Sequence, residues 1–200
     1  MQNSVIARRT FTLGLVAAAA GTLMACSKSE NTPATPAAGQ LSPAQMYDKI
    51  ASEGKGFTVG AMMSANTVYV LFDPQCPHCG HLWEAAKPLL SKVKFVWVPV
   101  AIINPKSSAQ GAALLASDKP LEAMTAHEAS ILAGTGGMTA MGSVPAEIEA
   151  AVKANTAIFN TLGLESVPFV VAKNGTSGVV QTNSGAMETA ALTAWLGLAG

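Results

Sequence analysis

Charged residues are scarce in this sequence, and arginine is nearly absent. Only 12% of the 200 residues are charged, and the 12 basic and 12 acidic side chains cancel. Arginine occurs only at Arg8 and Arg9, and every other basic residue is a lysine. Recognition of a phosphate backbone depends on a clustered cationic face, so this composition argues against nucleic acid as a partner. Half of the residues are hydrophobic, which is enough for one packed domain.

Long apolar runs are also lacking, because the N-terminal run over residues 13–20 is too short for a typical transmembrane helix. It follows Arg8 and Arg9 and precedes small residues, the pattern of an export signal over residues 1–25. The signal leads into Leu-Met-Ala-Cys, which resembles the lipobox of bacterial lipoproteins. We therefore expect Cys26 to carry a lipid anchor; the alternative is an ordinary secretory signal with a coincidental cysteine. The arginine pair leaves the export route open between the general secretory and twin-arginine systems.

Cysteine is limited to three positions. If Cys26 carries lipid, only Cys76 and Cys79 remain, and an oxidising compartment allows such a pair to cycle. Residues 26–40 are rich in Ser, Thr, Pro and Ala, the composition of a flexible tether. The folded domain is expected over residues 41–200.

The hydrophobic pattern of that domain predicts alternating helices and strands. Ser42 is a candidate N-cap for its first helix, and Gly54 and Gly56 end that helix. After it we expect a buried strand at 67–73, a helix at 82–90 kinked by Pro88, a strand at 95–102, helices near 107–117, 120–133 and 145–162, a strand at 168–172, a hairpin turn at Asn174-Gly175, a strand at 178–182 and a helix at 187–197. This order predicts an α/β fold with a mixed central sheet flanked by helices.

The residues with the clearest chemistry are Cys76 and Cys79, which lie directly after a predicted strand and at the predicted start of a helix. Unpaired N–H groups and the helix dipole stabilise a thiolate there. We expect Cys76 to be the exposed attacking sulfur and Cys79 the resolving thiol. Pro77 suits the first helical position, and His78 adds a positive or donating group that lowers the pKa of Cys76. A stabilised thiolate favours the reduced pair, so its disulfide is a ready oxidant.

The segment around this pair resembles a known family. Residues 72–83, Phe-Asp-Pro-Gln-Cys-Pro-His-Cys-Gly-His-Leu-Trp, look like the active-site segment of the periplasmic DsbG and DsbC thiol-disulfide interchange proteins. Residues 103–109 and 113–117 are similar as well, and the resemblance runs from about Ser42 to the C-terminus. It implies a thioredoxin fold with an inserted helical block at about 105–163.

The resemblance also assigns a substrate-binding turn to Val167 and Pro168. In this superfamily a cis-proline before a strand faces the catalytic cysteines, and the backbone of the preceding residue pairs with the substrate chain. The Cys-Pro-His-Cys tetrad and the valine are DsbA-like, whereas DsbG is expected to carry tyrosine and threonine. The chain ahead of residues 67–73 leaves no room for the N-terminal dimerisation domain of DsbC and DsbG. This weakens an isomerase assignment, and we expect a monomer.

Metal binding is an alternative use of a Cys-x-x-Cys pair. Zinc would need four ligands, and there is no second such pair. A copper-handling lipoprotein is a stronger alternative, because two thiols, a histidine and Met62-Met63 suit Cu(I). We expect no metal and no cofactor, with the methionines as packing residues. Asp73 is expected to cap the turn or to relay a proton to Cys79, and His127 to be a structural or exposed histidine far from the site.

The sequence therefore predicts a thiol-disulfide oxidoreductase of the cell envelope that exchanges disulfides with exported proteins through Cys76 and Cys79. Its expected partners are those cysteine-containing substrates, a membrane redox protein of unknown identity, and the membrane itself through the lipid on Cys26. Oxidation, isomerisation and reduction all use the same residues, and the partner that recharges the pair sets the direction.

Overall fold

The computed structural model describes residues 41–139 and 144–198, and the expected signal, tether and lipidated Cys26 lie outside them. The elements of this part follow in chain order: α1 (Pro43–Glu53), β1 (Phe57–Gly60), β2 (Thr67–Phe72), α2 (Pro77–Ala86), the short 3-10 helix η1 (Lys87–Leu89), β3 (Lys94–Pro99), α3 (Lys106–Leu115), α4 (Pro120–Leu132), α5 (Ala146–Thr161), β4 (Phe169–Lys173), β5 (Val180–Ser184) and α6 (Thr189–Trp195).

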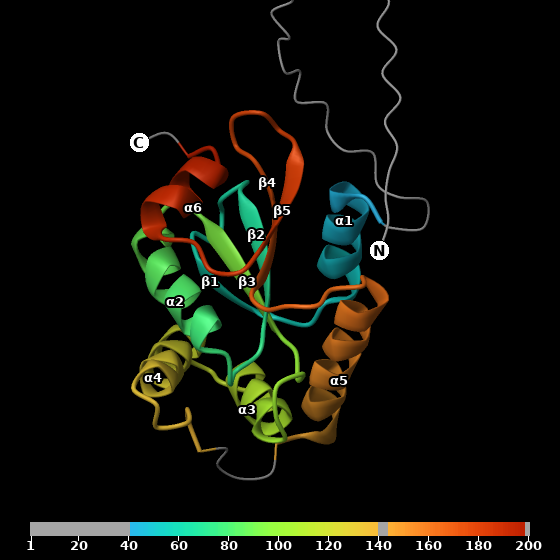
Figure 1. Ribbon diagram of the computed structural model, residues 1–200, viewed down its shortest axis with the longest axis vertical. Coiled ribbons are helices and arrows are strands. Elements are labelled where there is room, and N and C mark those ends of the chain that lie inside the picture. Colours follow the sequence, from blue (N-terminus) through green and yellow to red (C-terminus); the bar gives the residue numbers. More distant parts are fainter. Residues whose placement is uncertain (1–40, 140–143, 199–200) are drawn as a thin grey trace, which may run out of the picture. The chain divides into compact units, whose positions relative to one another are not determined.

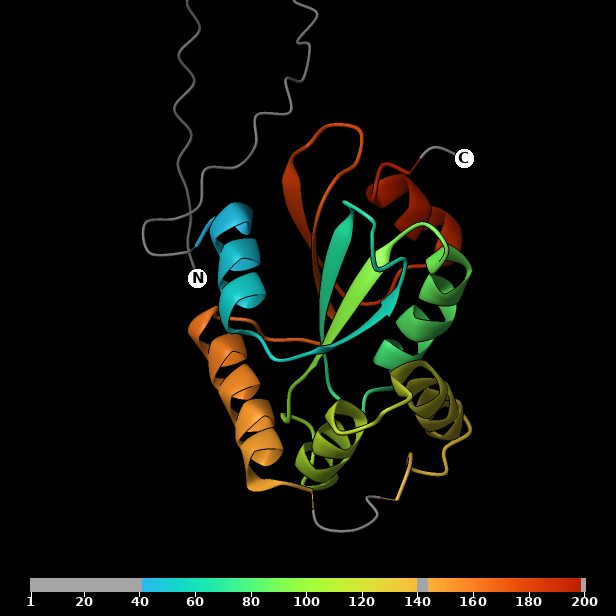
Figure 2. The same cartoon turned by 180° about the vertical axis from the view of Figure 1, so that it is seen from behind.

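The strands form one mixed sheet in the order β1-β3-β2-β4-β5. Strand β2 runs parallel to β3 and antiparallel to β4, while β1 and β5 are antiparallel edge strands. Helices α1 and α5 lie on one side of the sheet, and α2 and α6 lie on the other (Figures 1 and 2). Helix α4 packs against α2, and α3 lies at the end of the sheet where β2 and β3 finish (Figure 1). The sheet is therefore covered on both faces.

Local signals explain where the first helix begins and ends. The Ser42 hydroxyl accepts a hydrogen bond from the Gln45 N–H at 3.3 Å, and the Gln45 side chain accepts one from the Ser42 N–H at 2.9 Å. This capping box satisfies two N–H groups that the helix itself cannot pair. Gly54 ends α1, as the sequence predicted.

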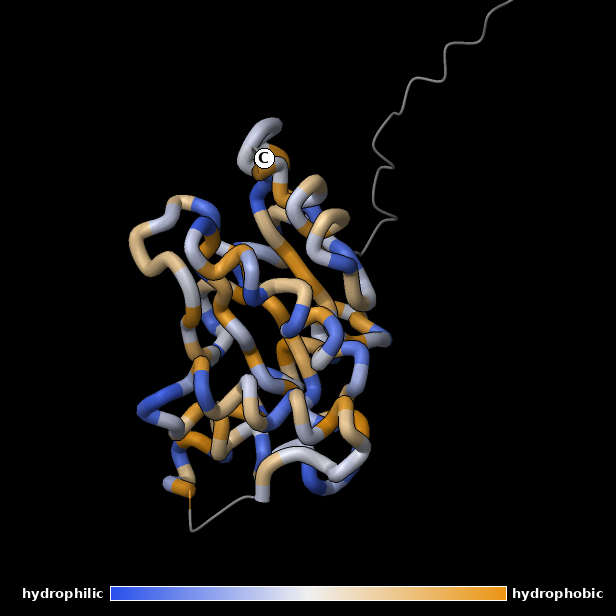
Figure 3. Tube along the Cα trace, turned by 90° about the vertical axis from the view of Figure 1, so that its left-hand side faces the viewer, coloured by the Kyte–Doolittle hydropathy of each residue, from blue (hydrophilic) through white to orange (hydrophobic). Residues whose placement is uncertain are grey.

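The core lies on both faces of the central strands, which appear as hydrophobic segments inside the fold in Figure 3. In both β2 and β3 the first residues alternate between half-buried and buried, and the last three residues are all buried. One aromatic contact joins α2 to the sheet, with ring centroids 5.2 Å apart for Trp83 and Trp97. Two more join side chains within the sheet, at 5.5 Å for Phe72 and Trp97 and 6.0 Å for Phe57 and Phe72. Trp83 is thus a core residue.

The predicted α/β class and mixed sheet are confirmed, and the three inserted helices lie within two residues of their expected bounds. In place of a kink at Pro88, α2 ends at Ala86 and the 3-10 helix η1 begins at Lys87. Strand β1 was not predicted, because its four residues are too few to show a period.

The hairpin turn between β4 and β5 differs from the expected Asn-Gly turn. Gly178, with φ of 72°, adopts the left-handed conformation, whereas Gly175 does not. The Asn174 side chain accepts hydrogen bonds from the Thr176 and Ser177 N–H groups, which lengthens the turn. Strand β5 therefore starts two residues later than predicted.

Candidate active site

Cys76 is the N-cap of α2 and lies directly beyond the end of β2. Pro77 is the first helical residue, and the Cys76 side chain makes no capping hydrogen bond. The Cys79 and Gly80 N–H groups donate to the Cys76 carbonyl at 3.0 and 3.3 Å, which starts the helix. Both cysteines are free thiols. The thiol of Cys76 is thus held at the positive end of α2, as the sequence predicted.

The two thiols have opposite acidities. The pKa of Cys76 is lowered to about 6, chiefly by the hydrogen bond that the Cys79 thiol donates to Cys76 Sγ. The N–H groups of Cys79 and His78 lower it further, and together these hydrogen bonds outweigh burial, which raises the pKa. Burial raises the pKa of Cys79 well above its usual range. Near neutral pH the reduced pair is therefore a Cys76 thiolate beside a Cys79 thiol, which matches their expected division into attacking and resolving sulfurs.

The expected exposure of Cys76 needs a correction, because only 4% of the residue is accessible. A turn from the other half of the chain covers it: Cys76 Sγ lies 3.6 Å from the Val167 carbonyl oxygen. The Val167–Pro168 peptide bond is cis. The structure thus brings together the two segments that the resemblance paired. His78 and His81 are exposed on α2, with ring centroids 6.4 Å apart.

Asp73 holds the turn that leads from β2 into α2. Its carboxylate is fully buried and accepts four hydrogen bonds over 2.7–3.0 Å. The donors are the N–H groups of Gln75, Ile102 and Ile103 and the hydroxyl of Ser107. These donors use both oxygens, so the structure supports the capping role for Asp73.

His127 is part of the site, although the sequence placed it far away. It is fully buried on α4, and its Nδ1 accepts a hydrogen bond from the Met138 N–H at 3.1 Å. Its Nε2 must then carry the proton and donates to the Pro74 carbonyl at 2.7 Å. Burial lowers the pKa of His127, so the ring is neutral. The only sequence signal was its position among apolar residues on one helical face.

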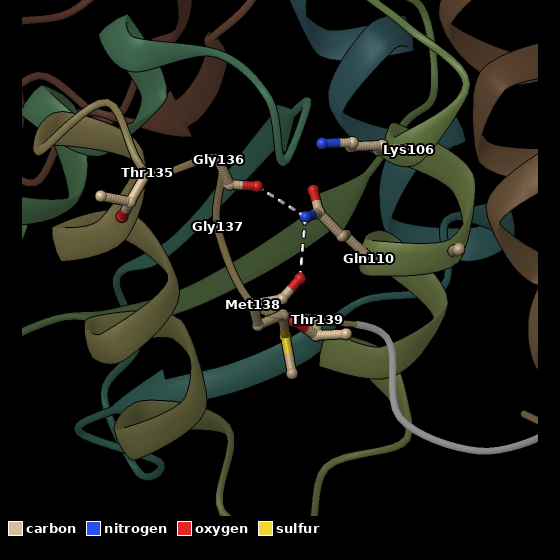
Figure 4. A pocket seen from close by; sticks show the side chains of 8 residues that line it. Lys106, Gln110, Thr135, Gly136, Gly137, Met138 and Thr139 are labelled. Atoms are coloured by element: carbon tan, nitrogen blue, oxygen red, sulfur yellow. Dashed lines mark hydrogen bonds between the residues drawn. The ribbon is translucent and has the colours of Figure 1, made fainter.

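A glycine-containing segment after α4 is tied to the same turn. The Gln110 side chain donates to the Gly136 and Met138 carbonyls at 2.9 and 2.8 Å (Figure 4). Gln75, next to Cys76, donates to Gln110 at 2.5 Å and to the Gly136 carbonyl at 3.0 Å. These bonds connect the inserted helices to the active-site turn.

Comparison with known proteins shows what this geometry resembles. No family model matches the chain. It is 31% identical over 140 residues to the thiol:disulfide interchange protein DsbG of Pseudomonas aeruginosa, covering 69% of this chain and 54% of that protein. Against DsbG of Escherichia coli it is 42% identical over 65 residues, 32% of this chain and 26% of that one. The chain is therefore similar to DsbG over these stretches.

The chain spans about half or less of the length of these curated relatives. Its fold is also that of a periplasmic thioredoxin-like protein from Salmonella enterica serovar Typhimurium, with a TM-score of 0.61 at 13% identity over 78% of this chain and 96% of that one. The domain thus has the thioredoxin fold, with helices α3 to α5 inserted between β3 and β4.

Met62 and Met63 do not join the cysteine pair. They follow β1, whose last residue, Gly60, pairs with Lys94 at the start of β3. Cys76 follows the opposite end of the sheet, where Phe72 pairs with the last residue of β3. The described residues contain no group of three His, Cys, Asp or Glu side chains suited to a metal ion. Met62 and Met63 are also not the packing residues that we expected, because they are 61% and 97% exposed.

Proposed function

We propose that this chain is a thiol-disulfide oxidoreductase that exchanges disulfides with cysteine-containing exported proteins. One observation carries the proposal: the Cys76 sulfur, whose pKa is lowered to about 6, lies at the start of α2 and 3.6 Å from the Val167 carbonyl. The name of its DsbG relatives, thiol:disulfide interchange protein, supports the same reaction.

In the proposed reaction a substrate thiolate attacks Cys76 Sγ of the oxidised pair. The Cys76–Cys79 bond breaks, a mixed disulfide with Cys76 forms, and the electron pair passes to Cys79 Sγ. A second substrate thiolate then attacks the substrate sulfur, and Cys76 leaves as the stabilised thiolate. Pro77 and His78 shape the helix start that stabilises this leaving group.

Substrate binding is proposed at Val167 and Pro168. The Val167 carbonyl already faces Cys76 Sγ, so an extended substrate segment paired with this backbone would bring its own cysteine to the same sulfur. Ile102 and Ile103, whose N–H groups donate to Asp73 in the turn before Cys76, are exposed and add apolar surface near that turn.

The direction proposed is disulfide donation, because a stabilised Cys76 thiolate favours the reduced pair. The test is the equilibrium of the Cys76/Cys79 pair with glutathione, combined with a Cys79→Ala variant that traps mixed disulfides in an envelope extract. We expect a potential well above that of thioredoxin, about −270 mV, and trapped exported proteins. A potential near that of thioredoxin would contradict donation. A variant that traps no protein through Cys76 would contradict disulfide exchange.

The proposed location is the bacterial periplasm, with Cys26 as a lipidated membrane anchor and the protein as a monomer. The DsbG relatives and the lipobox-like Leu-Met-Ala-Cys support this location. No helix in residues 41–139 and 144–198 is long and apolar enough to cross a membrane. Cys26→Ser should move the protein from the membrane to the soluble envelope fraction, and continued membrane fractionation would rule the anchor out.

A further inference from the structure

Glu128 is a buried carboxyl group that the proposed reaction does not yet use. It lies on the face of α4 that also carries the buried residues Met124, His127 and Ile131. The residue is completely inaccessible, and neither carboxyl oxygen has a hydrogen-bond partner among the described residues. Leaving a buried polar group unpaired is unfavourable, and an ionised one far more so. The site therefore favours a protonated carboxyl.

This carboxyl lies against the backbone beside the resolving cysteine. Helix α4 packs on α2, and a methyl group placed on Gly80 would meet Glu128 Oε2 at 3.0 Å. Gly80 follows Cys79 directly and is itself buried. The missing side chain at this position lets the Glu128 carboxyl approach the first turn of α2.

The charges around Glu128 also oppose its ionisation. Burial, then the negative charges of Cys76, Asp73 and Glu84, raise its pKa to about 9. Strand β1, which also packs on α4, has no titratable residue. The charged and titratable side chains on the other elements packed against α4 are His78, Cys79, His81 and Glu84 on α2 and Lys106 on α3. The two histidines are exposed, and the Lys106 amino group lies near Gly136.

We propose that Glu128 is the proton donor to Cys79 when the disulfide opens, and the group that takes this proton back when the disulfide reforms. The proposal rests on the exchange function proposed above. When a substrate thiolate attacks Cys76 Sγ, the Cys76–Cys79 bond breaks and Cys79 Sγ receives the electron pair and the Glu128 proton. Glu128 is left as a carboxylate and regains a proton from solvent. In the reverse step Glu128 first releases its proton to solvent, and the carboxylate then accepts the Cys79 proton as Cys79 attacks the mixed disulfide.

The test compares Glu128→Gln with Glu122→Gln, the same change at an exposed position of α4 paired with Lys119. The measurement is the rate at which dithiothreitol reduces the oxidised full-length protein, followed against pH and corrected for the thiolate fraction of the reagent. Glu128→Gln keeps the shape of the side chain but holds no transferable proton. We expect it to react on the order of 10²-fold more slowly at neutral pH, the lower end of the effect of a positioned proton donor.

The pH profile separates proton donation from a packing effect. The wild type should lose rate as the pH rises through the pKa of Glu128, whereas Glu128→Gln should lack this decline and Glu122→Gln should keep it. Alkylation of Cys76 in the reduced Glu128→Gln variant should match the wild type, which shows that the attacking thiolate is intact. Equal rates and profiles for the wild type and Glu128→Gln would overturn the proposal while leaving the exchange function standing.

A second measurement does not depend on whether the variant folds. Carboxyl-carbon NMR of the wild type, with the Glu128 signal assigned by sequential connectivity, reports whether this carboxyl is protonated at neutral pH. A protonated signal in the oxidised protein is expected, and a carboxylate signal there would overturn proton donation. A wild type that fails to react with dithiothreitol or with substrate thiols would instead reject the exchange function itself.

Discussion

The acidity of Cys76 depends more on its neighbour in the pair than on the histidine between them. The hydrogen bond from the Cys79 thiol is the largest influence that lowers the pKa of Cys76, and the charge of His78 is the smallest. The sequence emphasised His78 because its position beside the sulfur is visible in the tetrad. The hydrogen bond between the two thiols forms because the first turn of α2 brings Cys79 next to Cys76, and the sequence does not show it.

This order of influences predicts different outcomes for two variants. Cys79→Ala should raise the pKa of Cys76 towards its usual value and slow its alkylation at pH 7 by about tenfold, since an ordinary cysteine is only a few per cent thiolate there. His78→Phe should have a clearly smaller effect. The measurement is the pH dependence of iodoacetamide alkylation in the reduced proteins. An effect of His78→Phe equal to or larger than that of Cys79→Ala would contradict the assignment.

At the scale of elements, α4 and the segment after it support the active-site turn. His127 on α4 joins the Pro74 carbonyl to the Met138 N–H, and the Gly137 N–H donates to the Ser130 hydroxyl at 3.1 Å. Gly137 has φ of 81°, and a side chain there would meet the His127 ring at 2.5 Å. Glycine at this position is therefore required both by the backbone conformation and by the close approach of His127.

Two alanine substitutions separate these requirements. Gly134 has φ of 72°, and a Cβ added there would have no atom within 4 Å. Gly134→Ala therefore strains only the left-handed backbone and should destabilise the fold by about 1 kcal/mol. Gly137→Ala adds the collision with His127 and should cost about 2 to 4 kcal/mol. Denaturant unfolding of both variants measures the difference. Equal losses would show that the His127 contact is easily displaced.

At the scale of the whole molecule, the protonated Glu128 should make stability depend on pH. Its pKa is about 9 in the folded protein, whereas an unfolded glutamate ionises near pH 4.3. Between these values the unfolded chain releases a proton that the folded one keeps, so the contribution of Glu128 to stability is lost as the pH rises. The lowered pKa values of Cys76 and His127 act in the opposite direction, since folding then favours their deprotonated forms.

A comparison of the wild type with Glu128→Gln isolates this contribution, because the other titrating groups are common to both. The unfolding free energy of the reduced wild type should fall relative to the variant by up to about 1.4 kcal/mol per pH unit between about pH 5 and 8. Chemical denaturation at several pH values gives this difference. A constant difference across that range would mean that the folded protein does not hold a proton on Glu128.

The sequence by itself determined the α/β class, the order of most elements and the position of Cys76 and Cys79 at a helix start. These follow from local patterns: apolar periodicity, the Ser42 cap and the spacing of the two cysteines. The pairing of Val167 and Pro168 with the cysteines came from a family resemblance, and the cis bond is visible only in the structure.

Only the tertiary structure decided which distant residues surround the pair. His127 and Glu128 are more than 45 positions from Cys79 in the sequence, and nothing in their own helix marks them as part of the site. The packing of α4 on α2 buries them there. Because the buried Glu128 carboxyl has no hydrogen-bond partner among the described residues, burial raises its pKa and keeps it protonated. Burial is a property of the packed fold, so the pattern around the cysteines could not reveal it.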